Sequence, residues 1–402
     1  MTLTLDDIDL LADTWAKAVP HDQFELLRRE APVFWHEEPD DTGFWAITRW
    51  DDIVAISRDH ATFSTEQGGT FIPTQPEADL ELMRLSILNM DPPKHDRFRK
   101  LVSAGFTPRM IRRLIEQVNE HATHIVDGIA HKGEIDYVDV SAELPIAMIC
   151  EMLGIPEADW PQMRAWSDRM VGWDDPEYST PEEGEIAAAE MFAYCDALAK
   201  AKRDNPTDDI MSALVHADVD GDRLTDIELN LFFVTLVIAG NETTRNLISH
   251  GMLCMMENPD VAEELRQHPE KMSAAVDEML RWGSSIQNFR RTATRDTEIR
   301  GVPIKKGDKV VTFYMSGNFD EEHFEDPFTF RLDRGVNDHV AFGGGGIHFC
   351  LGSHLAKAEI GAIIGETINR LPDIRLNGDV VRLRSDFING VKHLPVAFTP
   401  DI

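Results

Sequence analysis

The chain has 402 residues, of which 43% are hydrophobic and 27% charged, so it can bury a large core and is not disordered by composition. Asp and Glu outnumber Lys and Arg by 71 to 39, and the formal net charge of −32 disfavours non-specific attraction to nucleic acid or anionic lipid. The first residues are acidic with interrupted apolar positions, and the longest apolar run, LFFVTLVIAG, covers about half of the ~20 residues that span a bilayer. We therefore expect a cytoplasmic protein without a membrane span.

The segment up to about residue 65 combines short helices with a hairpin. In APVFWHEEPDDTGFWAITRW two aromatic-rich runs are joined by a polar turn that ends at Gly43, which predicts two paired strands. From about residue 94 to 285 apolar residues recur every three or four positions, as in MIRRLIEQVNEHATHIVDGI, which predicts helices.

After about residue 290 the spacing of the apolar residues changes, and DTEIRGVPIKKGDKVVTFY predicts short strands around Gly301 and Gly307. The last helix is expected from about Leu351 to Leu371. These patterns predict the mainly α class with small β-sheets contributed from both ends of the chain, in one large domain over residues 1–402.

The segment LTDIELNLFFVTLVIAGNETTRNLISHGML predicts a long helix through the core. Thr225 and Glu228 form a capping box at its start, and the apolar residues then continue in phase as far as Gly240. Glycine costs helix stability and a buried carboxylate is expensive without a partner, so Gly240, Glu242 and Thr243 need an explanation. They mark either a solvent-facing turn of the helix or a functional site.

Four cysteines lie far apart and form no C-x-x-C pair, which argues against a disulfide framework or a zinc ribbon. Cys150, Cys195 and Cys254 sit among apolar residues at helical spacing, so we expect them to be small buried hydrophobes. Cys350 differs because four consecutive glycines precede it, in AFGGGGIHFCLG at residues 341–352.

The glycine run does not suit phosphate or dinucleotide binding. A P-loop needs a Lys after its glycines, and a dinucleotide fingerprint needs a βαβ unit, and neither is present in the sequence. What remains is a loop beside a buried cysteine, or a loop that presents one sulfur to a metal. Glycine lets the backbone approach a flat ligand, and a helix that starts after Cys350 favours the thiolate, which suits axial ligation of haem iron.

Together these segments resemble the cytochrome P-450 family of haem-thiolate monooxygenases, in its soluble bacterial form, over nearly the whole chain. The family's haem motif is Phe, two residues, Gly, one residue, His or Arg, one residue, Cys, one residue and Gly, which Gly346, His348, Cys350 and Gly352 match. Phe342 lies one position further from the cysteine than the general motif has it. This longer FGGGG form is similar to the branch that acts on steroids, terpenoids and methyl-branched lipids.

The resemblance implies haem b (iron protoporphyrin IX) with Cys350 as the iron ligand. It also implies that the long helix crosses the distal face of the haem, where Ala239 and Gly240 leave room for dioxygen and the catalytic pair Glu242 and Thr243 delivers protons. Together with matches in PPKHDRFRK and FRRTATRD, the implied cofactor-binding residues are His95, Arg99, Ala239, Gly240, Arg291, Phe342, Gly343, His348, Cys350 and Gly352.

Two further sets of residues follow from the resemblance. Glu278 and Arg281, by themselves a routine i, i+3 ion pair, are expected to join Arg334 in a structural network that locks the cysteine loop. The segments expected to line the substrate pocket are mainly apolar, which suits a lipophilic molecule with few polar anchors. Their residues are Phe71, Ile72, Ile238, Ile286, Gln287, Phe289 and Ile388.

The activity implied is hydroxylation of an unactivated C–H bond with dioxygen and two electrons. The pocket residues do not distinguish a steroid from a terpenoid or a branched or fatty lipid. Because no flavin or nicotinamide fingerprint is evident, an iron–sulfur ferredoxin and its ferredoxin reductase are expected to supply electrons to a monomeric enzyme. The basic residues expected to guide an acidic ferredoxin, unless they are only solvated helix faces, are Lys94, Arg97, Lys100, Arg109 and Lys357.

Two alternatives keep the haem but change the function: a haem-thiolate peroxygenase, and a non-catalytic haem sensor or electron carrier. Glu242 and Thr243 count against the sensor and the carrier, because neither role requires a proton relay. A peroxygenase is expected to have an acid-binding Arg in place of that pair.

Overall fold

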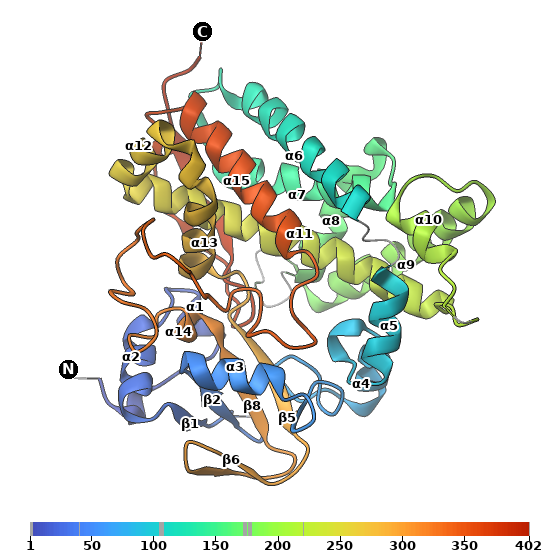
Figure 1. The fold of residues 1–402 in the computed structure, drawn as a ribbon, viewed down its shortest axis with the longest axis vertical. Helices are drawn as coiled ribbons and strands as arrows, with labels where there is room; N and C mark the ends of the chain where they lie inside the picture. Colours follow the sequence, from blue (N-terminus) through green and yellow to red (C-terminus); the bar gives the residue numbers. More distant parts are fainter. Residues whose placement is uncertain are drawn as a thin grey trace. The chain divides into compact units, whose positions relative to one another are not determined.

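The computed structural model describes residues 3–39, 41–103, 108–171, 175, 179–219 and 221–401. These residues form two compact units, each assembled from separate stretches of the chain. We call them the sheet unit (1–95, 280–351 and 384–389) and the helical unit (96–279, 352–383 and 390–402). Helices predominate and the sheets are small, which confirms the predicted class (Figure 1).

The sheet unit is built on a five-stranded sheet in the order β1-β2-β8-β5-β3. The predicted hairpin is confirmed, because β1 and β2 pair antiparallel on either side of the turn at Gly43, whose φ is +79°. β2 pairs in parallel with β8, so strands from distant parts of the chain share one sheet. The strands are β1 Val33–His36, β2 Phe44–Ile47, β3 Phe63–Ser64, β5 Asn288–Ala293, β6 Thr297–Ile299, β7 Val302–Ile304 and β8 Lys309–Phe313.

Short helices and an aromatic core support this sheet. Phe44 of β2 and Phe313 of β8 are fully buried and pack with Trp15 and Phe24, whose ring lies 5.4 Å from that of Phe313 between centroids. The described helices that lie wholly in this unit are η1 Leu5–Asp7, α1 Ala12–Trp15, α2 His21–Glu30, α3 Trp50–Arg58, α4 Glu77–Met83, η2 Ile87–Asn89 and α14 Tyr314–Gly317. Helices α5 Lys94–Val102 and α13 Met272–Gly283 have residues in both units.

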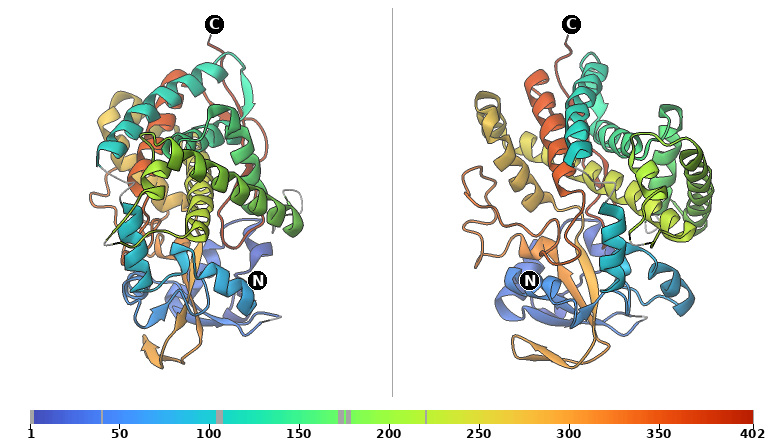
Figure 2. Two further views of the ribbon diagram at one scale, coloured as in Figure 1. Left: turned by 90° about the vertical axis from the view of Figure 1, so that its right-hand side faces the viewer. Right: turned by 45° about the vertical axis from the view of Figure 1, so that its right-hand side comes forward.

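The helical unit is organised around α11, which spans Asp226–Glu257 and contacts α7, α8, α9 and α15. In both views of Figure 2 α15 (red) lies alongside α6 (teal), and the two helices are in contact. The remaining helices are α6 Pro108–Ile129, α7 Tyr137–Leu153, η4 Glu157–Asp159, α8 Trp160–Val171, α9 Pro181–Asp204, α10 Ile210–Val215, α12 Pro259–Gln267, η5 Pro269–Lys271 and α15 Ser353–Arg370. Its strands are β4 Glu134–Asp136, β9 Arg375–Leu376, β10 Val381–Arg382, β11 Val391–His393 and β12 Pro395–Ala397.

The start of α11 confirms the predicted capping box. The Glu228 backbone N–H donates to Thr225 Oγ1 at 3.3 Å, and the Thr225 backbone N–H donates to Glu228 Oε2 at 2.8 Å. These bonds satisfy two of the donors that a helix N-terminus leaves open, and the helix then continues for 32 residues.

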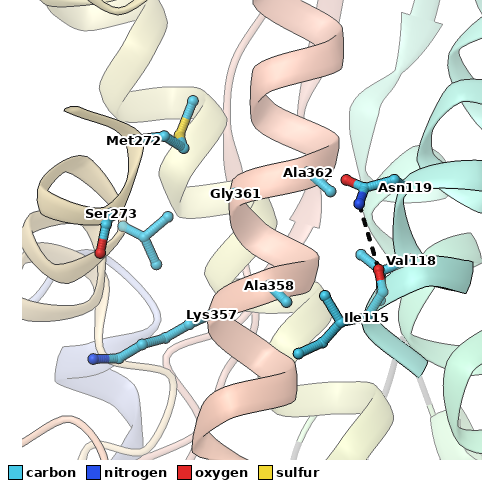
Figure 3. Close-up of a pocket in the computed structure, with 10 residues that line it drawn as sticks. Ile115, Val118, Asn119, Met272, Ser273, Lys357, Ala358, Gly361 and Ala362 are labelled. Atoms are coloured by element: carbon cyan, nitrogen blue, oxygen red, sulfur yellow. Dashed lines mark hydrogen bonds between the residues drawn. The ribbon is translucent and has the colours of Figure 1, made fainter. Parts of the chain in front are cut away.

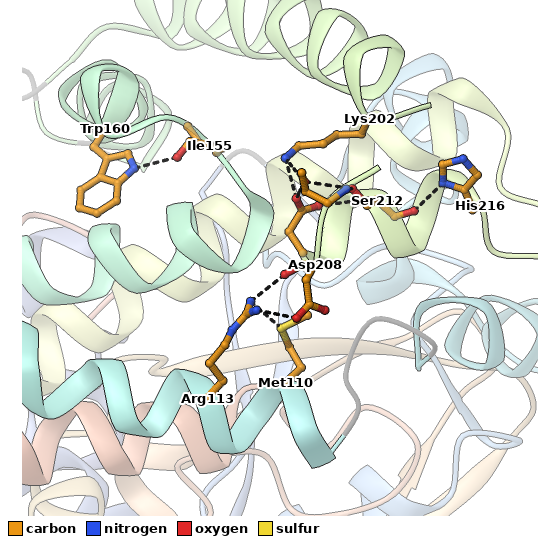
Figure 4. Close-up of polar contacts among 10 residues, drawn as sticks. Met110, Arg113, Ile155, Trp160, Lys202, Asp208, Ser212 and His216 are labelled. Carbon is orange, nitrogen blue, oxygen red and sulfur yellow. Dashed lines mark hydrogen bonds and ion pairs between the residues drawn. The ribbon is translucent and has the colours of Figure 1, made fainter. Parts of the chain in front are cut away.

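Polar contacts hold the short helix α10 against its neighbours (Figure 4). Asp209 caps α10 by accepting from the Ser212 N–H at 2.7 Å, and Lys202 of α9 donates to the same carboxylate. Arg113 of α6 donates to Asp208 Oδ2 at 2.8 Å, so α6, α9 and α10 are fixed to one another.

Among the described residues no helix combines the length and the apolar character needed to cross a membrane.

Candidate functional site

The glycine loop before Cys350 is pressed against α3 within the sheet unit. A Cβ added at Gly346 would lie 2.3 Å from the backbone oxygen of Ser57, and one at Gly344 would lie 2.9 Å from the Cα of Val54. Gly343, Gly345 and Gly346 also have φ between +79° and +90°, a conformation that side chains rarely adopt. The run of glycines is therefore required both by backbone conformation and by close packing.

This loop gives Cys350 an environment unlike that of the other three cysteines. The Cys350 N–H donates to the Phe342 carbonyl at 3.1 Å, and the Cys350 side chain is half-buried. Cys150, Cys195 and Cys254 are buried, as predicted, and burial raises the pKa of Cys150 and Cys195 far above the usual range of a thiol. Cys350 is thus the cysteine best placed to offer its sulfur to a ligand.

Two of the predicted cofactor-binding residues meet beside this loop. The rings of His95 and His348 lie 4.8 Å apart between centroids in an edge-to-face arrangement, although the two residues are far apart in the sequence. Thr65 Oγ1 lies 3.3 Å from His348 Nε2 and donates to Asp91 Oδ1 at 3.1 Å. Phe342 is half-buried on the loop itself, and its ring lies 6.4 Å from that of Phe349.

Arg291 on β5 is a buried cation without a carboxylate partner among the described residues. Arg291 is 5% exposed, its Nη1 donates to the Arg290 carbonyl at 2.8 Å, and the side chain also interacts with Tyr314. Burial lowers the pKa of Arg291, because the charged form is removed from water. An arginine in this situation suits a ligand that brings its own carboxylate.

The acid–alcohol pair lies on α11 in the helical unit, together with Ala239, Gly240 and Ile238. Thr243 Oγ1 donates to the Ala239 carbonyl at 2.6 Å, and Thr243 is half-buried. Glu242 is 1% exposed, and its Oε2 accepts from Arg245 Nη2 at 2.6 Å. The alternative of a solvent-facing turn is therefore wrong for Glu242.

Burial is the largest influence on Glu242 and raises its pKa to about 7. Arg245 opposes this effect by favouring the carboxylate, and the neighbouring Asp168 raises the pKa further. Glu242 therefore exchanges its proton near neutral pH, which an ordinary surface glutamate does not do.

Gly240 has a packing role that the sequence did not indicate. A Cβ at this position would lie 2.9 Å from Cδ1 of Ile149 on α7, so the glycine allows α11 and α7 to approach closely. Its expected role in leaving room for dioxygen stays a prediction.

Arg99 lies half-buried on α5 and Gly352 is the N-cap of α15, both in the helical unit.

The predicted structural network involves two arginines that bind backbone carbonyls. Arg281 is fully buried and donates to the Asn318 carbonyl at 2.8 Å, with its guanidinium carbon 5.0 Å from the Phe319 ring centroid. Arg334 donates to the Glu325 carbonyl at 2.6 Å. Glu278 is 1% exposed and belongs to the helical unit, and its expected role in the network stays a prediction.

Several predicted pocket residues meet in an aromatic cluster of the sheet unit. Phe387 contacts Phe71 and Phe289, with centroid distances of 4.8 Å and 5.4 Å. Ile286 forms a β-bridge with Ile388, which brings the segment before β5 beside the C-terminal turn. Phe387 belongs to the same segment, DFINGV, as the predicted pocket residue Ile388.

The remaining two pocket candidates in this unit are buried. The Gln287 N–H donates to the Phe387 carbonyl at 2.9 Å, and Gln287 Nε2 donates to the Ser385 carbonyl at 3.1 Å. Ile72 is 2% exposed and packs in the core with Phe44 and Phe313.

Most of the predicted basic patch is neutralised by acidic neighbours. Arg97 pairs with Asp222 at 2.6 Å and with Glu228 at 2.7 Å. Lys357 pairs with Asp277 at 2.6 Å, and Lys94 pairs with Glu66. Lys100 is exposed, and the side chain of Arg109 lies outside the described residues.

A groove of about 320 Å³ lies between α6, α13 and α15, with Ile115, Val118, Ala358 and Ala362 among its lining residues (Figure 3). Lys357 of the predicted basic patch lines this groove, whereas none of the predicted catalytic, cofactor-binding or substrate-pocket residues does.

A half-buried thiol on a glycine loop, two histidine rings in contact and a buried arginine that forms no ion pair within the described part of the chain suit a haem-thiolate protein. The chain belongs to the cytochrome P450 family, whose model, described as "Cytochrome P450", matches residues 186–372. It is thus an oxidoreductase, a monooxygenase with a haem-iron cofactor. The residues present fit that cofactor, because Cys350 offers a soft thiolate donor and Arg291 a cation for a haem carboxylate.

The comparisons also identify relatives within the family. The chain is 41% identical to a steroid C26-monooxygenase of Rhodococcus jostii, over 96% of this chain and 83% of the relative. It is 40% identical to a methyl-branched lipid omega-hydroxylase of Mycobacterium bovis, over 98% of this chain and 95% of the relative. A Mycobacterium marinum cytochrome P450 solved in complex with pseudoionone is 41% identical, with a TM-score of 0.90 over 98% of this chain and 99% of that one.

Gly346→Ala is expected to displace the cysteine loop. The added methyl group would lie 2.3 Å from the Ser57 oxygen, and such overpacking costs about 1–3 kcal/mol. We expect a lower haem-to-protein absorbance ratio and a lower urea midpoint of unfolding. Gly343→Ala is the matched control, because its φ is also positive but no atom lies within 4 Å of its added Cβ. Equal losses in the two variants would contradict the packing argument.

Proposed function

We propose that this enzyme hydroxylates an unactivated C–H bond of a lipophilic substrate, a steroid, a terpenoid or a branched or fatty lipid, with dioxygen and two electrons. The observation that carries the proposal is the half-buried Cys350 on a glycine loop, in a chain that also buries a titrating acid, Glu242, beside Thr243. Relatives named as a steroid C26-monooxygenase and a methyl-branched lipid omega-hydroxylase support this choice of substrates.

The proposed cofactor is haem b, held by the residues of the cysteine loop and its neighbours. Cys350 would bind the haem iron, and Arg291, His95, His348 and Arg99 would bind the two propionates. When bound, the haem supplies the redox chemistry that activates dioxygen.

Glu242 and Thr243 would control proton delivery to dioxygen. Glu242 takes up and releases a proton near neutral pH because burial raises its pKa to about 7. The Thr243 hydroxyl, which donates to the Ala239 carbonyl, can redirect its hydrogen bond toward a ligand by rotation about χ1. The peroxygenase and sensor alternatives give this pair no role.

The aromatic cluster of Phe71, Phe289 and Phe387 would bind the apolar body of the substrate. Three phenyl rings within contact distance form a surface that excludes water and offers few polar anchors, which suits a steroid or branched alkyl chain.

A ferredoxin with its ferredoxin reductase is the proposed electron source, since the sequence shows no flavin or nicotinamide fingerprint. The ion pairs of Arg97 and Lys357 reduce the positive charge that would guide an acidic ferredoxin. Lys100 is exposed, and contact of Lys100 and Arg109 with the ferredoxin stays a prediction of the sequence. A monomeric, cytoplasmic enzyme stays a prediction of the sequence.

Cys350→Ser is expected to abolish thiolate ligation, because a serine hydroxyl stays protonated at neutral pH and is a much weaker donor. The reduced, carbon monoxide-bound protein should lose the red-shifted absorption band that gives the family its name. Cys195→Ala, at a buried cysteine of the helical unit, is the control and should keep the band. Persistence of the band in Cys350→Ser would remove Cys350 as the ligand.

Thr243→Ala is expected to leave haem content and substrate binding unchanged and to uncouple the reaction. Without the hydroxyl, protons are no longer delivered to dioxygen in the right sequence. The amount of product formed per reduced electron donor consumed should therefore fall by about tenfold or more, while the amount of hydrogen peroxide released should rise. Thr244→Val removes a hydroxyl from the adjacent buried position and serves as the control. An unchanged product ratio in Thr243→Ala would mean that protons travel by another path.

A steroid and a methyl-branched lipid are both expected to give a substrate-type spectral change. Phe387→Ala should lower the affinity for the more tightly bound of these two compounds by about tenfold. This corresponds to ~1.4 kcal/mol, which is within the contribution of one buried phenyl ring. Phe328→Ala, at a phenyl ring that is 47% exposed in the same unit, should leave the affinity unchanged. Equal affinities in wild type and Phe387→Ala would exclude the aromatic cluster from the pocket.

A further inference from the structure

The buried Glu242 belongs to a chain of charged groups that extends to a second helix. Arg245 uses both terminal nitrogens, because Nη2 donates to Glu242 Oε2 at 2.6 Å and Nη1 donates to Asp168 Oδ1 at 2.9 Å. Asp168 lies on α8, which packs against α11. One guanidinium therefore holds two carboxyl groups from different helices beside each other.

Exposure rises step by step along this chain of groups. The side chains of Glu242 and Arg245 are 1% and 2% exposed, whereas that of Asp168 is 28% exposed. Arg164, one turn before Asp168 on α8, lies 3.8 Å from it and also donates to Asp139 of α7, whose side chain is 71% exposed. Asp168 is thus the carboxyl group that both reaches water and contacts the buried cluster.

The charge of Asp168 also influences the proton of Glu242. Burial raises the pKa of Glu242 to about 7, Arg245 opposes the shift, and the charge of Asp168 adds to it. Asp168 can also accept a hydrogen bond from the protonated carboxyl group of Glu242. Because Arg245 stays protonated throughout, it cannot carry the proton itself and acts by position and charge.

We propose that Asp168 takes up protons from solvent and passes them to Glu242, and that Arg245 is the positioning residue that keeps the two carboxyl groups within reach. The proposal rests on the proposed function of Glu242 as the distal acid. A proton from water binds Asp168, moves along the hydrogen bond to Glu242, and leaves Glu242 toward dioxygen. Each carboxylate is then restored, and no electron moves in these steps.

Other charged groups near α8 occupy different positions. On α7, burial raises the pKa of Glu143 while Arg164 opposes the shift, and Asp139 binds Arg164. On α9, Glu190 accepts from Trp166 Nε1 at 2.6 Å and pairs with Arg169 at 3.3 Å. Glu190 is therefore a carboxylate bound to the same helix as Asp168 but through another arginine, which makes it a matched control.

The first test measures the titration of Glu242 in the resting protein by infrared spectroscopy of the protonated carboxyl band, assigned by its loss in Glu242→Gln. In Asp168→Asn this titration should move to lower pH, because the negative charge that raises the pKa of Glu242 is gone. Glu190→Gln should leave it in place. A Glu242 titration that is the same in wild type and Asp168→Asn would overturn the proposal without reference to activity.

The second test measures product formed per reduced cofactor and the solvent deuterium isotope effect on turnover. Asp168→Asn should lower the ratio by about tenfold and enlarge the isotope effect, since a proton-transfer group is lost. Asp168→Glu, which keeps a carboxyl group, should restore both, and Glu190→Gln should match wild type. If Glu242→Gln uncouples the reaction but Asp168→Asn does not, protons enter elsewhere and the proposal fails while the proposed function stands. If Glu242→Gln and Thr243→Ala are both fully coupled, the proposed relay itself fails.

Discussion

The close contact between the glycine loop and α3 is the constraint on which the surroundings of Cys350 depend. At Gly346 only a hydrogen atom fits against the Ser57 oxygen, and the backbone there has φ of +79°. The loop can then fold back so that the Cys350 N–H bonds the Phe342 carbonyl, which fixes the cysteine. His348, two residues earlier, meets His95 because the loop has this path.

In the helical unit, the position of Glu242 depends on two opposing requirements of α11. α11 must pack tightly, and Gly240 permits this by admitting Ile149 of α7. It must also bury a carboxyl group, which is unfavourable unless a partner compensates for lost hydration. Arg245 supplies that compensation for Glu242 only in part, so the acid stays able to exchange its proton near neutral pH.

Acidic side chains bind several of the arginines among the described residues. In a chain with a formal net charge of −32, Arg97 and Arg245 are each bound by two carboxylates. Arg291 is buried without an ion pair among the described residues, and it is also one of the residues that the family resemblance assigned to haem. Tyr314 and Asp91 favour its charged form without offsetting the effect of burial, so its retention in the interior is costly and therefore informative.

The sequence by itself determined the features that depend on neighbouring residues: the hairpin around Gly43, the capping box at Thr225, the helix after the cysteine loop and the identity of Cys350 as the special cysteine. These follow from local hydrogen bonding, periodicity and glycine conformation, which act over a few residues. The tertiary structure alone decided that Phe387 meets Phe71, that Ile149 faces Gly240 and that Asp168 shares an arginine with Glu242. Helical periodicity shows that a residue is buried but not against which segment, and these contacts join segments that pack together only in the folded chain.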